Sequence, residues 1–231
     1  YLLTYADRGF SGNPHDTGND RTYSLDVLPQ EFPCRLTGDF RSPVLDLVNA
    51  DGSLGCDLRY QGYEICDGKY NLKGLPAVYA AEEEAQTLII YMKDQVTGLQ
   101  VELLYGVLPE YDVITRSAKV INTEEDKIRL TKAQAACIDF LHGEFDVISF
   151  YGRHAMERNM QRTSVGHGAF VIGSRRGTSS HQYNPMMILA EKETTEDAGT
   201  CYGMSFVYSG GFKAEVEKDQ FGQTRMQMGL Q

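Results

Sequence analysis

The chain has 231 residues, of which 42% are hydrophobic, and its formal net charge is −10. This length and apolar content suffice for one domain with a hydrophobic core. The acidic balance argues against a nucleic-acid partner, which needs clustered Lys and Arg. No window reaches the roughly 18 continuous apolar residues of a membrane-spanning helix, and no basic-then-apolar leader opens the sequence.

Period-two alternation of apolar and polar residues dominates the chain and predicts β-strands. Short turns rich in Gly, Asn and Asp separate the alternating segments, so consecutive strands are expected to pair antiparallel. Two weaker strands precede the clear ones, and the last residues, 226–231, alternate as well. The predicted strands are, in chain order, 44–47, 58–63, 87–92, 99–105, 113–122, 128–139, 145–151, 186–191, 202–208 and 212–216.

One segment, 153–162, is predicted to be helical, because Met156 and Met160 stand four residues apart and would form a thin apolar stripe. Two longer acidic segments, 122–127 and 191–200, are predicted to be solvated turns. Many strands joined by short turns favour an all-β antiparallel sandwich. We expect a dozen or more strands in two large sheets, with few short helices.

The five cysteines predict neither a disulfide framework nor a zinc site, because their number is odd and no Cys-x-x-Cys pair occurs. Reduced thiols in a cytoplasmic protein are expected, each one a small buried hydrophobe. No nucleophile elbow, His-Glu-x-x-His or dinucleotide loop is present either. We therefore expect no metal and no cofactor. The cysteines are Cys34, Cys56, Cys66, Cys137 and Cys201.

The segment from Asp7 to Arg41 is polar, aromatic and rich in Gly and Pro at once, which is typical of a shaped loop that faces a ligand or partner. Together with five later motifs it resembles the N-terminal region of family 36 glycoside hydrolases, the microbial α-galactosidases. The resemblance covers essentially the whole chain. The later motifs begin at Asp57, Leu72, Asp112, Arg176 and Tyr202.

This resemblance implies a β-supersandwich, galactose mutarotase-like in fold, that precedes a catalytic (β/α)8 barrel. In the family the barrel carries an Asp nucleophile in a Lys-x-Asp-x-Asn motif and hydrolyses terminal α-linked galactose, as in melibiose and raffinose, with retention. No such motif occurs here. We therefore expect residues 1–231 to lack catalytic residues and to be inactive alone. They are expected to form a single domain truncated at both ends, because the sequence starts without Met and stops within an alternating segment.

The resemblance also implies a set of substrate-binding residues. In tetrameric members this domain lends a loop to the active-site mouth of a neighbouring subunit, and the lent Asp and Arg match Asp7 and Arg21. A carboxylate and a guanidinium suit sugar hydroxyls, although the two could instead pair with each other. A lent aromatic residue, commonly Trp, matches Tyr151, which can stack on a pyranose or simply end a strand.

Other conspicuous polar residues are expected to be structural. Arg176, His181 and Asn184 are assigned a structural role, in which the His and Asn side chains satisfy backbone groups where a loop enters the strand at Met186. Ion pairs that hold loops are expected from Asp39, Arg41 and Arg59.

Three alternative functions remain. Two, an α-N-acetylgalactosaminidase and a galactosyl transferase, belong to the same family. The third is a stand-alone carbohydrate-binding β-sandwich, which should show an exposed aromatic platform. A domain cut from a larger enzyme should instead expose an apolar face that met the barrel.

Overall fold

The structure, a computed structural model, describes residues 28–35 and 38–230. Within these ranges the chain forms thirteen strands and two short 3-10 helices, η3 (Glu82–Glu84) and η4 (Pro109–Tyr111). No helix in the described part is long and apolar enough to cross a membrane. All the pairings between these strands are antiparallel, as the alternation and the short turns predicted.

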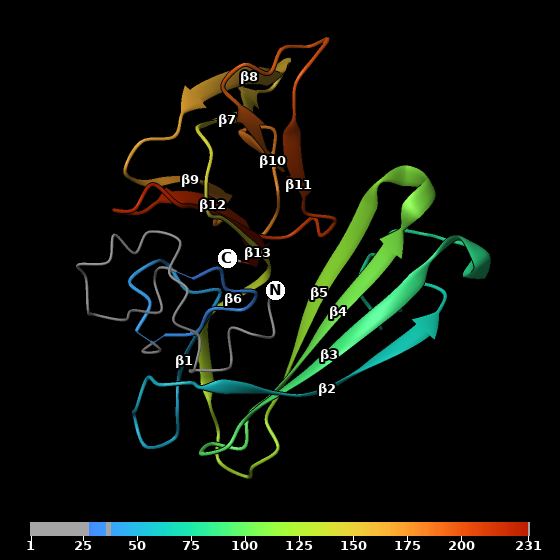
Figure 1. The fold of residues 1–231 in the computed structure, drawn as a ribbon, viewed down its shortest axis with the longest axis vertical. Helices are drawn as coiled ribbons and strands as arrows, with labels where there is room; N and C mark the ends of the chain where they lie inside the picture. The colour runs from blue at the N-terminus through green and yellow to red at the C-terminus, as the bar shows by residue number, and fades with distance from the viewer. Residues whose placement is uncertain (1–27, 36–37, 231) are drawn as a thin grey trace.

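The strands form three hydrogen-bonded sheets, whereas the sequence predicted two (Figure 1). A five-stranded central sheet has the order β1-β6-β13-β12-β9, the β7 sheet has the order β11-β10-β7-β8, and the β2–β5 sheet follows chain order. The central sheet comprises β1 (Leu45–Val48), β6 (Arg129–Phe140), β13 (Thr224–Leu230), β12 (Phe212–Lys218) and β9 (Gly168–Ser174). The β7 sheet comprises β11 (Cys201–Ser205), β10 (Tyr183–Glu191), β7 (Phe145–Arg153) and β8 (Met156–Ser164). The β2–β5 sheet comprises β2 (Leu58–Asp67), β3 (Gln86–Asp94), β4 (Gln100–Leu108) and β5 (Val113–Ile121).

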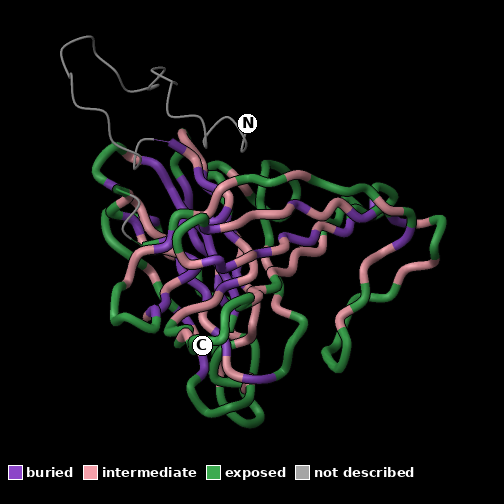
Figure 2. Tube along the Cα trace, turned by 90° about the horizontal axis from the view of Figure 1, so that it is seen from below, coloured by how far each residue is buried: buried purple, intermediate pink, exposed green. Residues whose placement is uncertain are grey.

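Two hydrophobic clusters join the sheets. One lies between the central sheet and the β7 sheet, where Met187 and Leu189 of β10 meet Phe212 and Met226. The other joins β1 and β6 to the β2–β5 sheet through residues such as Leu47 and Leu103. Figure 2 shows the buried stretches gathered in the middle of the molecule. Side chains alternate between the two faces of a strand, so residues of the central sheet can belong to both hydrophobic clusters.

The second face of the central sheet carries charged side chains where β12 and β13 run. Arg225 is fully buried there, and the segment before β1 covers it. Asp39 and Arg41 of that segment form a buried ion pair, and Arg41 also reaches Asp139 at 3.4 Å. The predicted ion pairs of Asp39 and Arg41 are therefore confirmed, and they hold this segment on the sheet.

The predicted helix at 153–162 is wrong, because residues Met156–Ser164 form strand β8, which pairs with β7. A spacing of four residues puts Met156 and Met160 on one face of a strand as readily as on one face of a helix. Ala155 and Arg158 also have positive φ values of 60° and 57°, which a right-handed helix does not accept. The residues at 154–155 instead make a tight turn between β7 and β8.

Candidate functional site

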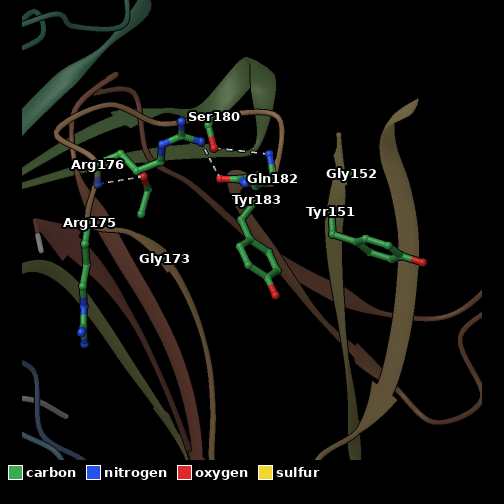
Figure 3. Close-up of a pocket in the computed structure, with 9 residues that line it drawn as sticks. Tyr151, Gly152, Gly173, Arg175, Arg176, Ser180, Gln182 and Tyr183 are labelled. Carbon is green, nitrogen blue, oxygen red and sulfur yellow. Dashed lines mark hydrogen bonds between the residues drawn. The ribbon is translucent and has the colours of Figure 1, made fainter. Parts of the chain in front are cut away.

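A cavity of about 490 Å³ opens where β7 and β10 meet the end of β9 (Figure 3). This volume lies within the usual range for small-molecule sites. Three segments supply its lining. β7 contributes Tyr151 and Gly152, the end of β9 and the loop after it contribute Gly173, Ser174, Arg175, Arg176, Ser180 and Gln182, and β10 contributes its first residue, Tyr183.

Two tyrosines stand side by side at this cavity. Tyr183 is paired with Tyr151 across β10 and β7, at a place where the register shifts before Met187. A shift of this kind re-aims side chains locally. In Figure 3 the Tyr183 ring lies in the middle of the site, while Tyr151 stands at the rim with its hydroxyl directed away from Arg176. Both side chains are exposed, so their rings are free to meet a ligand.

Gly152 allows strand β8 to pack closely against strand β7. Its backbone N–H donates to the carbonyl oxygen of Gln182 at 3.2 Å, which ties β7 to the segment entering β10. A Cβ at this position would lie 2.3 Å from the carbonyl oxygen of Met156. The glycine is therefore required for β8 to fold back beside Tyr151.

The polar end of the cavity is organised by Arg176. Its Nη1 donates to Oε1 of Gln182 at 2.8 Å. The Ser174 hydroxyl donates to the carbonyl oxygen of Thr178 at 2.6 Å, which closes the loop that carries Arg176. The backbone N–H of Gln182 donates to the Ser180 hydroxyl at 3.3 Å. A hydrogen bond thus joins the side chains of Arg176 and Gln182, both of which are exposed.

The base of the β7–β8 hairpin is held by Asp146. Its carboxylate accepts hydrogen bonds from Arg162 at 2.7 Å, Lys192 at 2.8 Å and Ser164 at 2.9 Å. Burial alone would raise the pKa of Asp146, but the hydrogen bonds from Lys192, Arg162 and Ser164 outweigh it and lower the pKa to about 2. The hairpin that carries Tyr151 is therefore anchored by a charged carboxylate.

The chemistry available at this cavity is binding chemistry. Glycoside hydrolysis needs two carboxyl groups, and the lining residues that the structure describes include two arginines and no carboxylate. Guanidinium, amide and hydroxyl groups can hydrogen-bond to sugar hydroxyls, and tyrosine rings can pack on an apolar face. No group of three or more His, Cys, Asp or Glu within 28–35 and 38–230 is arranged to hold a metal ion.

The structure places one of the three predicted substrate-binding residues. Tyr151 lies at the cavity rim, whereas Asp7 and Arg21 lie outside the described residues. Arg176, which was assigned a structural role, lines the cavity and hydrogen-bonds Gln182; His181 and Asn184 do not belong to the lining. The cavity positions of Gln182 and Tyr183 were not predicted, although the motif that begins at Arg176 includes both.

The geometry so far defines a large antiparallel β-sandwich domain with an open aromatic and cationic cavity. The family model "Glycosyl hydrolase family 36 N-terminal domain" matches residues 4–231. The chain belongs to this family, as the motifs of the sequence indicated.

Similar proteins agree with this assignment. The chain is 62% identical to "Bifunctional alpha-galactosidase/sucrose kinase AgaSK" of Mediterraneibacter gnavus, across 100% of this chain and 25% of that protein. It is 44% identical to "Alpha-galactosidase Mel36A" of Lactobacillus acidophilus, across 97% of this chain and 31% of that protein. The chain thus spans about a quarter to a third of the length of these relatives.

Solved structures give the same result. The galactosidase domain of AgaSK superposes with a TM-score of 0.89, covering 100% of this chain and 32% of that one, at 62% identity. An α-galactosidase of Geobacillus stearothermophilus, AgaA, solved in complex with stachyose, also has a TM-score of 0.89, at 43% identity across 97% of this chain and 31% of that one.

Proposed function

We propose that this chain is the non-catalytic N-terminal domain of a retaining α-galactosidase that removes terminal α-linked galactose from melibiose- and raffinose-type sugars. The observation that carries the proposal is the match along the whole chain to proteins named α-galactosidases, at 62% and 44% identity. The catalytic carboxylates would lie in a (β/α)8 barrel that follows residues 1–231. This domain would support the barrel and contribute to the rim of the substrate pocket.

In this proposal the Tyr151 cavity is where the domain meets the substrate. The Tyr151–Tyr183 pair supplies aromatic surface, and the hydrogen-bonded Arg176–Gln182 pair supplies hydrogen-bond donors beside it. Both suit the sugar units beyond the galactose that is cleaved, because stacking and hydrogen bonding to a neutral sugar need no carboxylate. The solved relative that holds stachyose is consistent with an extended oligosaccharide as ligand.

Activity of the full-length protein tests this proposal. We expect release of galactose from raffinose, and a fall in kcat/KM of about tenfold for Tyr151→Ala, which corresponds to a loss of about 1.4 kcal/mol in the transition state. Tyr79→Ala is the matched control, because Tyr79 is 86% exposed and lies outside the cavity lining. Failure to release galactose would refute the activity, and unchanged kinetics of Tyr151→Ala would refute the role of the cavity.

Asp7 and Arg21 complete the proposed substrate-binding set. Each would lose one or two hydrogen bonds to sugar hydroxyls when replaced by Ala. We expect kcat/KM to fall by a factor that corresponds to about 1–3 kcal/mol for each substitution. Wild-type kinetics with raffinose in both variants would remove them from the set.

The full-length protein is further proposed to be a cytoplasmic homotetramer. The five free cysteines suit a reducing compartment. Tetramers would bring this domain to the active-site mouth of a neighbouring subunit, as the family resemblance suggested. Light scattering coupled to size-exclusion chromatography measures the assembly, and a monomer that is fully active on raffinose would contradict it.

A further inference from the structure

The β2–β5 sheet has an apolar area that no described segment covers. We call it the outer patch, and it consists of Tyr63, Ile65, Val107 and Ile114. Their exposed fractions are 61%, 61%, 38% and 65%. Scattered exposed apolar residues are ordinary, whereas a contiguous group on one face marks an interaction surface.

The strand register shows that the outer patch is contiguous. Tyr63 is opposite Ile90, and Ile90 is opposite Leu103, so Tyr63 shares a face with two residues of the core. Ile65 follows two residues after Tyr63 on this face, beside Leu88 of β3. Leu88 is opposite Tyr105 of β4, and Val107, two residues after Tyr105 on the same face, is directly opposite Ile114 of β5. The row of Val107 and Ile114 continues to exposed Gln86 and Asp67, which form a polar edge of the patch.

The same face is covered closer to the centre of the molecule. Ile90 and Leu103 are buried in the hydrophobic cluster that joins this sheet to β1 and β6. The outer patch therefore continues a face that is already an interior face elsewhere. Figure 1 shows the β2–β5 sheet projecting away from the central sheet and the β7 sheet, so these two sheets do not cover its projecting part.

The opposite face of the sheet has its own cover. The backbone N–H of Tyr70 donates to the Thr87 hydroxyl at 2.8 Å, and the Tyr70 hydroxyl lies 3.0 Å from that of Ser117. A Cβ on Gly106 would meet the side chains of Lys69 and Tyr70. The segment around Tyr70 thus packs on one face, and on the other face no segment within 28–35 and 38–230 covers the outer patch.

The outer patch suits an apolar partner. Arg116 lies on the same face as Ile65, in the row that continues through Tyr105. Its guanidinium forms an ion pair with Glu31 and lies 4.1 Å from the centre of the Tyr105 ring. The positive charge is thus compensated within the chain, and the surface beside it offers apolar contact.

We propose that the outer patch is the face on which the rest of the full-length polypeptide packs. This inference rests on the proposed function, because it requires a longer polypeptide. The chain covers 32% and 31% of two solved relatives, so about two-thirds of such a polypeptide lies beyond the part matched here. A tethered domain has an effective concentration in the millimolar range. It therefore competes successfully with a second copy of the chain for the same apolar face.

Hydroxyl-radical footprinting, read by mass spectrometry, tests the packing on native residues. The rates of oxidation of Tyr63, Ile65 and Ile114 are compared between the 231-residue chain and the full-length protein. We expect rapid oxidation in the chain and loss of this reactivity in the full-length protein. Two controls should react equally in both, Tyr79 for the aromatic residue and Val96, which is 93% exposed, for the aliphatic residues.

A stability measurement provides a second readout. Ile114→Asp should lower the Tm of the full-length protein and leave the Tm of the 231-residue chain unchanged, because only the former would bury the carboxylate. Val96→Asp is the control and should change neither Tm.

Three outcomes would overturn the inference. One is rapid oxidation of the outer patch in the full-length protein, and another is a full-length Tm that Ile114→Asp leaves unchanged. The third is protection in the 231-residue chain that disappears on dilution, which would identify a second copy as the occupant. The galactose-release assay is independent of footprinting, so an inactive protein with a protected patch would refute the proposed function alone.

Discussion

Arg225 and Asp139 form a buried bidentate ion pair, in which Nε of Arg225 donates to Oδ1 of Asp139 at 2.7 Å and Nη2 donates to Oδ2 at 2.8 Å. The guanidinium also donates to Asp39 and to the carbonyl oxygen of Ser42. Burial alone would lower the pKa of Arg225, but the hydrogen bonds to Asp139 outweigh it and raise the pKa above its ordinary value. The pair thus joins β13 to β6 and to the segment that precedes β1.

Arg225→Leu is expected to destabilise the chain by about 3–5 kcal/mol, because it removes the bidentate partner of the buried Asp139 carboxylate and leaves Asp39 with Arg41 as its remaining guanidinium partner. Urea unfolding followed by circular dichroism measures the change. Arg59→Leu is the matched control, since the Arg59–Asp57 pair is exposed and should change stability by less than about 1 kcal/mol. Equal effects of the two substitutions would show that the buried pair has no special role.

Gly152→Ala should displace the β7–β8 hairpin, because the new Cβ would meet the backbone of Met156 and Glu157. A clash with backbone atoms is relieved only by movement of the hairpin, so the variant should be less stable by about 1–3 kcal/mol. Nuclear magnetic resonance should show the largest chemical-shift changes at Tyr151 and its neighbours.

Gly166→Ala is the control for this substitution, because a Cβ there meets nothing within 4 Å. If Gly152→Ala were as stable as the control and left the Tyr151 signals in place, the close approach of β8 to β7 would not require glycine.

Much of the fold follows from alternation, because each face of a strand meets one environment. The strand around Leu189 was predicted for this reason, since β10 packs its alternate residues into the core. β8 was missed because its pattern is the reverse of a buried strand: every residue is partly or fully exposed, on both faces. With no buried face, the spacing of Met156 and Met160 could not distinguish a strand from a helix.

The candidate site could be predicted only in part. Tyr151 was found through the family resemblance, but its partner Tyr183 lies across the β7–β10 pairing, and sequence spacing does not reveal that register. The same holds for Asp139 and Arg225, which are 86 residues apart. Local patterns identify strands, whereas side-chain pairs from distant strands appear only when the sheet is assembled.

Glu64 is expected to control the reactivity of Cys66. The Cys66 thiol donates to Oε1 of Glu64 at 3.3 Å, and this hydrogen bond, followed by desolvation and the charge of Glu64, raises the thiol pKa. A higher pKa leaves less of the reactive thiolate at neutral pH. Glu64→Gln should therefore accelerate alkylation of Cys66, measured peptide by peptide with iodoacetamide. Exposed Cys201 is the internal control, and an unchanged ratio of the two rates would contradict this role of Glu64.

Asp146 should make the stability of the β7 sheet depend on pH in the acid range. Its pKa is lowered from 3.8 to about 2 in the folded chain. Because the folded pKa is the lower one, the stabilisation is fully present above about pH 4 and is lost as the pH falls toward 2. Asp146→Asn should thus be less stable than the wild type at pH 5, and the difference should shrink as the pH falls through this window.

Urea unfolding at several pH values between 5 and 2 measures this difference. Glu196→Gln, in the exposed loop before β11, is the control and should follow the wild type throughout. A difference between Asp146→Asn and the wild type that stays constant with pH would mean that the charge of Asp146 does not stabilise the hairpin. In that case the contacts of Arg162 and Lys192 with neighbouring carbonyl groups and hydroxyls would be what holds Tyr151 in position.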